Sequence, residues 1–208
     1  MKIQTPDSAD APVLSVQQLK ALLAACKGEG TIALRDKAIL WMLLETGLRH
    51  MELQKLMLFD VNAREGTCYV RRGKGGRPRT VVFGPATADA LRRYLRAVKP
   101  LRVRYWGEGD SPVFLSRYGI ALGYGGLGFM LKARGDAAGI PDMHAHLLRN
   151  AWRHYAQEAG LNDSEICTLA GWTSTRQLAR YGRQRAVQRA TTAARANPVG
   201  NVLRRHQA

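Results

Sequence analysis

The chain has 208 residues, enough for one globular domain, and its hydrophobic share of 46% is enough for a buried core. Thirty-two Lys and Arg against 16 Asp and Glu give a formal net charge of +16, which predicts a polyanionic partner, although a ribosomal-type or merely soluble basic protein would look similar. No apolar run approaches the roughly 18 to 20 residues of a membrane span. The N-terminus lacks the apolar segment of a signal peptide, so we expect no membrane partner and no secretion. Three cysteines, odd in number and far apart, are expected to be buried thiols in a cytoplasmic protein.

The first part of the chain predicts a linker and two helices. Residues 1–13 are polar and contain prolines, as is typical of a linker or loose arm. Ser15 and Gln18 have the spacing of a capping box, so a helix is expected to begin there. Residues 33–46 are apolar nearly all round, which predicts a central helix that ends at Gly47.

The middle of the chain predicts a β-hairpin followed by helices. β-branched and aromatic residues dominate 67–72 and 79–83, and a glycine-rich basic turn, 73–78, separates the two segments. Pro85 is expected to open a helix, and residues 100–112 are expected to form a loop. Further helices are predicted over 122–138 and 145–159, after Asn162, and in an Ala- and Arg-rich tail that ends near Ala196. The fold class is therefore mixed α/β, mostly helical, with one small antiparallel β-sheet.

Four residues in the second half of the chain have a distinctive spacing. His146 and Arg149 are three residues apart and would share one face of a helix, where they could be directed at one anion. Trp172 follows in a Gly-Trp pair, and Tyr181 comes nine residues after Trp172.

These motifs, together with Arg49 in Thr46-Gly47-Leu48-Arg49 and Lys74 in the glycine-rich turn, resemble the catalytic domain of the tyrosine recombinases, the phage integrase family. The sequence motifs Ala-Gly-Trp and Ala-Arg-Tyr-Gly are most similar to those of integrases of actinobacterial phages and mobile elements. The resemblance implies the fold of the DNA breaking-rejoining enzymes over residues 14–196, with a basic tail over 197–208. By the same resemblance, the N-terminal core-binding domain of the family is expected to be absent. The chain would then be either an excised fragment or a short single-domain recombinase.

The resemblance implies site-specific DNA recombination without a metal, cofactor or ATP. Arg49 and Arg149 would each hold a non-bridging oxygen of the scissile phosphate, because a guanidinium can donate two hydrogen bonds to it. Tyr181 would attack the phosphorus and remain joined to the DNA as a 3′-phosphotyrosine. Lys74 would protonate the leaving 5′ oxygen.

Supporting roles are expected for His146, which would relay the tyrosine proton or bind the phosphate, and for Trp172, which can donate a hydrogen bond but cannot act as a base. Glu52 would orient its neighbours. Each of these residues also has a purely structural interpretation: a half-buried histidine, a core tryptophan, or a carboxylate on a helix face. Contacts with the DNA backbone are expected from four further arginines, Arg72, Arg77, Arg79 and Arg176.

Two other patterns predict little. The His144-Ala145-His146 segment lacks a third metal ligand at helical spacing, and the GxGxxG match at 123–128 lies outside a βαβ unit. Asn150 and Ala145 depart from the family pattern, which usually has His and Pro there.

The resemblance also implies a set of partners. They are double-stranded DNA, further protomers in a tetrameric synapse formed by free monomers, and accessory DNA-bending proteins in the nucleoid of a bacterial host. A type IB topoisomerase and a DNA-binding module that does not cut are the alternatives.

Overall fold

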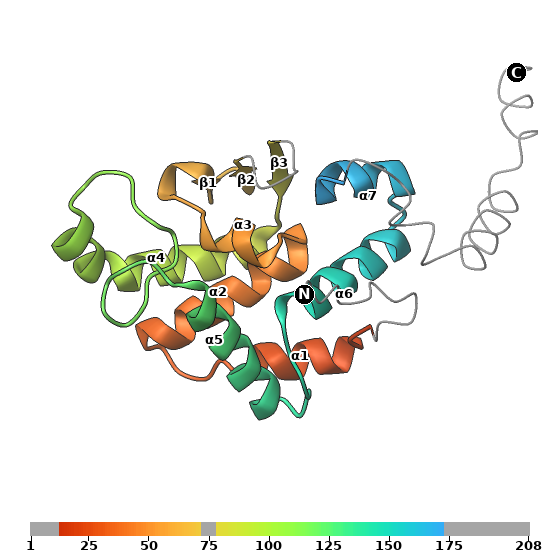
Figure 1. Ribbon diagram of the computed structural model, residues 1–208, viewed down its shortest axis with the longest axis horizontal. Coiled ribbons are helices and arrows are strands. Elements are labelled where there is room, and N and C mark those ends of the chain that lie inside the picture. The colour runs from red at the N-terminus through yellow and green to blue at the C-terminus, as the bar shows by residue number, and fades with distance from the viewer. Residues whose placement is uncertain (1–12, 72–77, 173–208) are drawn as a thin grey trace, which may run out of the picture. The chain divides into compact units, whose positions relative to one another are not determined.

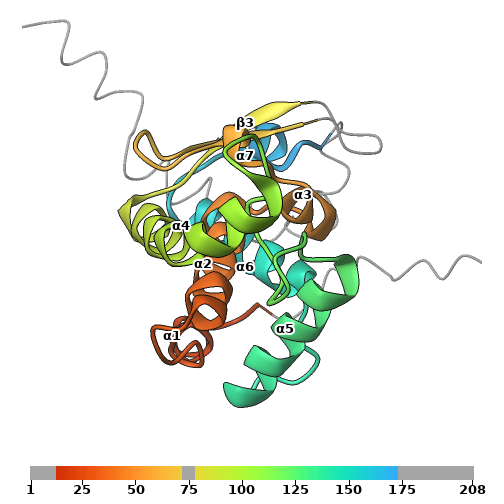
Figure 2. The same cartoon turned by 90° about the vertical axis from the view of Figure 1, so that its left-hand side faces the viewer.

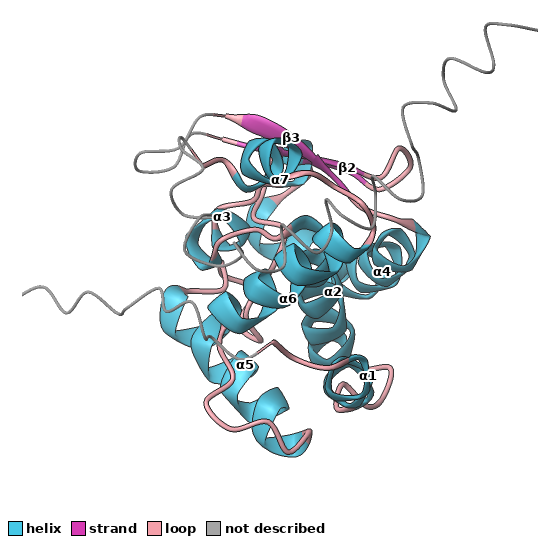
Figure 3. Cartoon of the chain, turned by 90° about the vertical axis from the view of Figure 1, so that its right-hand side faces the viewer, coloured by secondary structure: helices cyan, strands magenta, loops and turns pink. Residues whose placement is uncertain are grey.

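The computed structural model describes residues 13–71 and 78–172 (Figure 1). These residues form helices and one three-stranded antiparallel sheet, so the predicted mostly helical class with a small antiparallel sheet is confirmed (Figure 3). The helices are α1 (Val16–Ala24), α2 (Thr31–Thr46), α3 (His50–Gln54), α4 (Pro85–Trp106), α5 (Tyr124–Ala137), α6 (Ala145–Glu158) and α7 (Asp163–Ala170). A 3-10 helix, η1 (Leu58–Asp60), precedes the strands β1 (Val61–Asn62), β2 (Thr67–Val70) and β3 (Arg79–Val82).

Helix α2 is the centre of the core. It packs against α4 and α6, which flank it in Figure 2, and its residues 38–40 are fully buried. A helix that is apolar nearly all round needs neighbours on every side, which explains why two long helices cover it. The helix ends at Gly47, as predicted, in the left-handed conformation with φ 60°. A side-chain carbon at Gly47 would lie 2.3 Å from the Trp152 ring, so only glycine allows α6 to pack this closely.

The sheet has the order β1-β2-β3, and β2 pairs with β3 in the register Cys68↔Val81. Cys68 and Val81 face the core, whereas Tyr69 and Val82 are exposed, which is the alternation of a sheet covered on one side. The two strands confirm the predicted hairpin, but the turn between them lies outside the described residues. Strand β3 also packs against α7, which lies beside it in Figure 3.

Helix α4 continues through Pro100 to Trp106, so the predicted loop over 100–112 is wrong for its first half. Proline removes one helical hydrogen bond, but tertiary contacts after it stabilise the helix. The buried guanidinium of Arg102 donates to the Val113 carbonyl at 2.7 Å, and the Trp106 indole donates to the Gly119 carbonyl at 2.8 Å.

The cysteines are buried, as the sequence predicts. All three cysteines lie among the described residues, are buried, and form no disulfide. In the described part of the chain no helix is both long enough and apolar enough to span a bilayer.

Candidate active site

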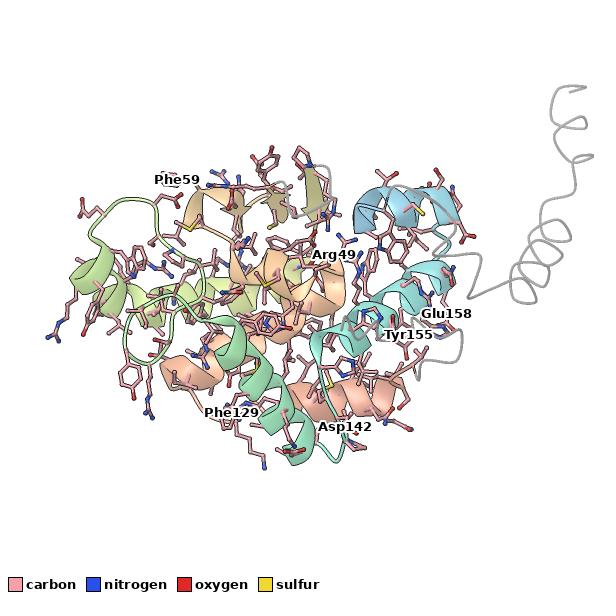
Figure 4. The ribbon with its side chains drawn as sticks, viewed as in Figure 1. Arg49, Phe59, Phe129, Asp142, Tyr155 and Glu158 are labelled. Carbon is pink, nitrogen blue, oxygen red and sulfur yellow. The ribbon has the colours of Figure 1, made fainter. Side chains whose placement is uncertain are left out.

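Arg49 stands where α2 ends and α3 begins. It is the residue that caps the N-terminus of α3, and its own backbone N–H donates to Glu52 Oε2 at 2.9 Å. Its guanidinium donates to Glu52 Oε1 at 3.1 Å, yet 41% of the side chain is exposed. Figure 4 shows Arg49 on the side of α3 that faces α7. The guanidinium is thus oriented by a carboxylate and still accessible to a ligand.

Arg149 lies on α6 and is buried. Its guanidinium donates to two backbone carbonyls, that of Gly47 at the end of α2 and that of Ala170 at the end of α7, the latter at 2.8 Å. Helix C-termini carry partial negative charge, so the meeting of two of them suits a cation. The guanidinium carbon also lies 5.1 Å from the centre of the Trp172 ring, within the range of a cation–π contact. Gly47 is two residues before Arg49, so this contact brings both arginine motifs to one place.

His146 lies one turn before Arg149 on α6, as the spacing predicted, and its side chain is exposed. The interpretation of a half-buried core histidine therefore does not apply. The His144 ring stacks near it, with 6.4 Å between the ring centres. Within residues 13–71 and 78–172 no group of three or more His, Cys, Asp or Glu could hold a metal ion.

Glu52 accepts from the backbone and the side chain of Arg49, and its own side chain is only 7% exposed. Burial acts to raise the pKa of Glu52, but hydrogen bonds from Arg79 and from the Arg49 backbone, together with both positive charges, lower it to about 2. Glu52 is therefore ionised at any pH at which the protein would be assayed.

Arg79 differs from its expected role as a DNA contact. Its side chain is 8% exposed, and its guanidinium donates twice to Glu52, at 2.9 Å each, and once to the Leu169 carbonyl, at 2.6 Å. All three nitrogens of the Arg79 guanidinium thus donate to internal acceptors, and this full set of internal partners does not favour a contact with phosphate. The signal was present in the sequence, because Arg79 is two residues before Val81 and shares its inward face of the strand.

Five of the predicted site residues lie outside the described residues, so the geometry above does not include them. They are the proposed nucleophile, the proposed general acid and three arginines expected to bind DNA: Tyr181, Lys74, Arg72, Arg77 and Arg176. The described part of the site thus consists of Arg49, Glu52, His146, Arg149 and Trp172. It offers two guanidiniums, an indole and an imidazole, which is a set suited to binding an anion and to stabilising negative charge that develops on it.

Comparison with known proteins shows which family the chain resembles. The model of the phage integrase family matches residues 12–187. Tyrosine recombinase XerC 2 of Ralstonia nicotianae is 34% identical over 167 residues, which are 80% of this chain and 47% of that protein. Tyrosine recombinase XerD of Listeria innocua is 30% identical over 174 residues, 82% of this chain and 58% of that protein. The chain thus spans about half the length of the curated relatives it matches.

Solved structures give the same result. The crystal structure of XerA recombinase superposes with a TM-score of 0.72 at 27% identity and covers 89% of this chain and 65% of that one. The Tn1549 transposon integrase in complex with transposon right-end DNA has the same fold, with a TM-score of 0.71 at 18% identity over 89% of this chain and 67% of that one. On the extent of the family match and the identity to these recombinases, the chain belongs to the phage integrase family, the tyrosine recombinases.

Proposed function

We propose that the chain is the catalytic domain, residues 14–196, of a site-specific recombinase that cleaves and rejoins double-stranded DNA. The observation that carries the proposal is the convergence of the two arginine motifs. The Arg149 guanidinium binds the Gly47 carbonyl, two residues before Arg49, and lies against Trp172. Family membership and the DNA complexes of similar fold, such as XerH recombinase bound to difH substrate, support DNA as the substrate.

The proposed reaction needs no metal or cofactor, because the two guanidiniums stabilise the charge on the non-bridging oxygens. The Tyr181 oxygen forms a bond to phosphorus while the bond from phosphorus to the 5′ oxygen breaks. Lys74 gives its proton to that oxygen, and His146 accepts the tyrosine proton or binds the phosphate. Attack by a 5′ hydroxyl on the phosphotyrosine reverses the cleavage reaction, releases the tyrosine and rejoins a strand without ATP.

A nicked duplex tests the proposal. When cleavage occurs next to the nick, the short 5′ fragment diffuses away and rejoining is prevented. We expect a protein–DNA adduct that survives denaturation in gel electrophoresis and disappears on proteolysis. Relaxation of supercoiled plasmid without site preference would instead indicate a type IB topoisomerase, and tight binding without any adduct would indicate a module that does not cut.

The affinity for DNA is expected to fall steeply with salt. A net charge of +16 implies several lysine and arginine contacts with phosphates, and each contact releases a counterion. With six or more contacts, the affinity should drop by about 10³-fold or more between roughly 50 and 200 mM salt. Fluorescence anisotropy of a labelled duplex measures this dependence, and a flat response would contradict the electrostatic argument.

Lys74→Ala is expected to block departure of the leaving group and not DNA binding. Loss of a general acid typically costs about 10²- to 10⁴-fold in rate. A substrate with sulfur in place of the bridging 5′ oxygen has a better leaving group, so it should restore cleavage by the variant. If Lys74→Ala is equally slow on both substrates, Lys74 is not the general acid.

Several finer assignments belong to the same proposal. They are the tetrameric synapse assembled from free monomers, accessory DNA-bending proteins, action in the nucleoid of a bacterial host, and similarity to actinobacterial phage and mobile-element integrases. The bacterial relatives support a bacterial host. The sequence motifs Ala-Gly-Trp and Ala-Arg-Tyr-Gly support the similarity to actinobacterial integrases. Arg72, Arg77 and Arg176 are the proposed contacts with the DNA backbone.

A further inference from the structure

We propose that Arg79 is a positioning residue for strand cleavage. It holds Glu52, and through Glu52 it holds the guanidinium of Arg49. The same Arg79 side chain holds the end of α7, to which Arg149 also binds. This role rests on the proposed function, since it concerns the rate of that reaction.

The first half of the argument is the pairing between Arg79 and Glu52. Two parallel hydrogen bonds of 2.9 Å join the guanidinium to both carboxylate oxygens. The same two oxygens accept from the backbone and the side chain of Arg49. Helix α3 has only five residues and is too short to fix a side chain by itself. The orientation of the Glu52 carboxylate, and with it that of the Arg49 guanidinium, therefore depends on the planar guanidinium of Arg79 on β3.

The second half is the C-terminal end of α7, where four backbone carbonyls lack partners within the helix. The backbone N–H of Gly171 donates to Thr168, and that of Trp172 donates to Cys167. The remaining two carbonyls are those of Leu169 and Ala170, and each accepts from an arginine of another element.

Those two arginines are Arg79 and Arg149. Arg79 Nε donates to the Leu169 carbonyl at 2.6 Å, and Arg149 donates to the adjacent Ala170 carbonyl at 2.8 Å. The Arg79 guanidinium also packs under Gly171, where a side-chain carbon would come within 2.7 Å of Nη1. One side chain thus links the strand after the Lys74 turn to both guanidiniums of the site.

The experiment compares cleavage by the full-length chain and by two variants, Arg79→Lys and Arg79→Met. Lysine keeps the charge but cannot form the fork, and methionine removes both. Single-turnover cleavage of the nicked duplex is expected to fall by about 10- to 100-fold, the cost known for removing a partner that orients a metal-binding side chain. DNA affinity should change by less than about twofold, because Arg79 does not face the solvent.

A second substrate separates positioning from general damage to the fold. In a methylphosphonate, a methyl group replaces one non-bridging oxygen, so the scissile group has no charge for Arg49 to neutralise. The deficit of both Arg79 variants should shrink on this substrate, as should that of Arg49→Ala. A misfolded site would be equally slow on both substrates.

The pH dependence gives a third readout. Among the described residues, Glu52 faces Arg49, Arg79 and the thiol of Cys68, whose pKa burial raises to about 12 so that it stays neutral. In Arg79→Met, burial should raise the pKa of Glu52, and the carboxylate that holds Arg49 is then lost as the pH falls. This variant should therefore lose activity at acidic pH where the parent does not. The double variant Arg79→Met/Glu52→Gln has no such group and should lack the additional loss.

A matched control is Arg93→Met, a change on α4 that breaks an exposed ion pair with Glu29 in the loop between α1 and α2 and should leave cleavage unchanged. If the parent chain gives no adduct, the proposed function fails. If the parent cleaves, and the Arg79 variants cleave equally fast or are equally slowed on both substrates, the positioning role is overturned.

Discussion

Tyr181→Phe is expected to abolish the covalent protein–DNA adduct and to leave DNA affinity unchanged. Phenylalanine keeps the aromatic ring but lacks the oxygen that would bond to phosphorus. Denaturing electrophoresis with the nicked duplex measures the adduct, and anisotropy measures the affinity. The effect should be complete, because the reaction as proposed has no other nucleophile.

Tyr155→Phe is the matched control. The Tyr155 hydroxyl donates to the Leu14 carbonyl at 3.0 Å, a contact between α6 and the segment that leads into α1 (Figure 4). Its removal should cost about 1 kcal/mol of unfolding free energy, the usual worth of one hydrogen bond, and leave adduct formation intact. An adduct that persists in Tyr181→Phe, or that mass spectrometry places on Tyr155, would contradict the assignment of the nucleophile.

Arg149→Lys is expected to lower the cleavage rate by about 10²- to 10³-fold, the cost of losing one donor that stabilises transition-state charge. The guanidinium spans the Gly47 and Ala170 carbonyls and stacks on Trp172. A lysine ammonium is a single point and cannot bind both carbonyls and also hold two hydrogen bonds to a phosphate. Single-turnover cleavage measures the rate, and thermal denaturation shows whether the variant is folded.

Arg134→Lys provides the comparison. This guanidinium is partly buried, and it donates twice to Asp36 Oδ2, at 2.6 and 3.0 Å, and once to the Ala25 carbonyl, at 3.0 Å. Asp36 lies in the first half of α2, whereas Gly47 follows its end. We expect Arg134→Lys to lower the melting temperature without lowering the cleavage rate of the folded protein. Equal losses of rate in the two variants would mean that Arg149 acts only through stability.

Local interactions explain what the sequence by itself determined. The Ser15–Gln18 capping box, the start of α7 after Asn162 and the end of α2 at Gly47 are all as expected, because each depends on residues at most four apart. The paired strands around the glycine-rich turn follow from the same kind of signal. The resemblance to the tyrosine recombinases singled out Arg49 and Arg149, and the structure places their two motifs together. The catalytic roles remain predictions for all six residues: Arg49, Lys74, His146, Arg149, Trp172 and Tyr181.

Only the tertiary structure decided to which acceptor each buried arginine donates its hydrogen bonds. Arg79 reads as one basic residue among several around a turn, but its partners are Glu52, 27 residues earlier, and the Leu169 carbonyl, 90 residues later. Arg149 binds carbonyls 102 and 21 residues away. Such partners depend on which helix ends meet when α2, α6 and α7 pack. Desolvation then requires every buried guanidinium to find an acceptor, and the packing of these elements determines which one lies within reach.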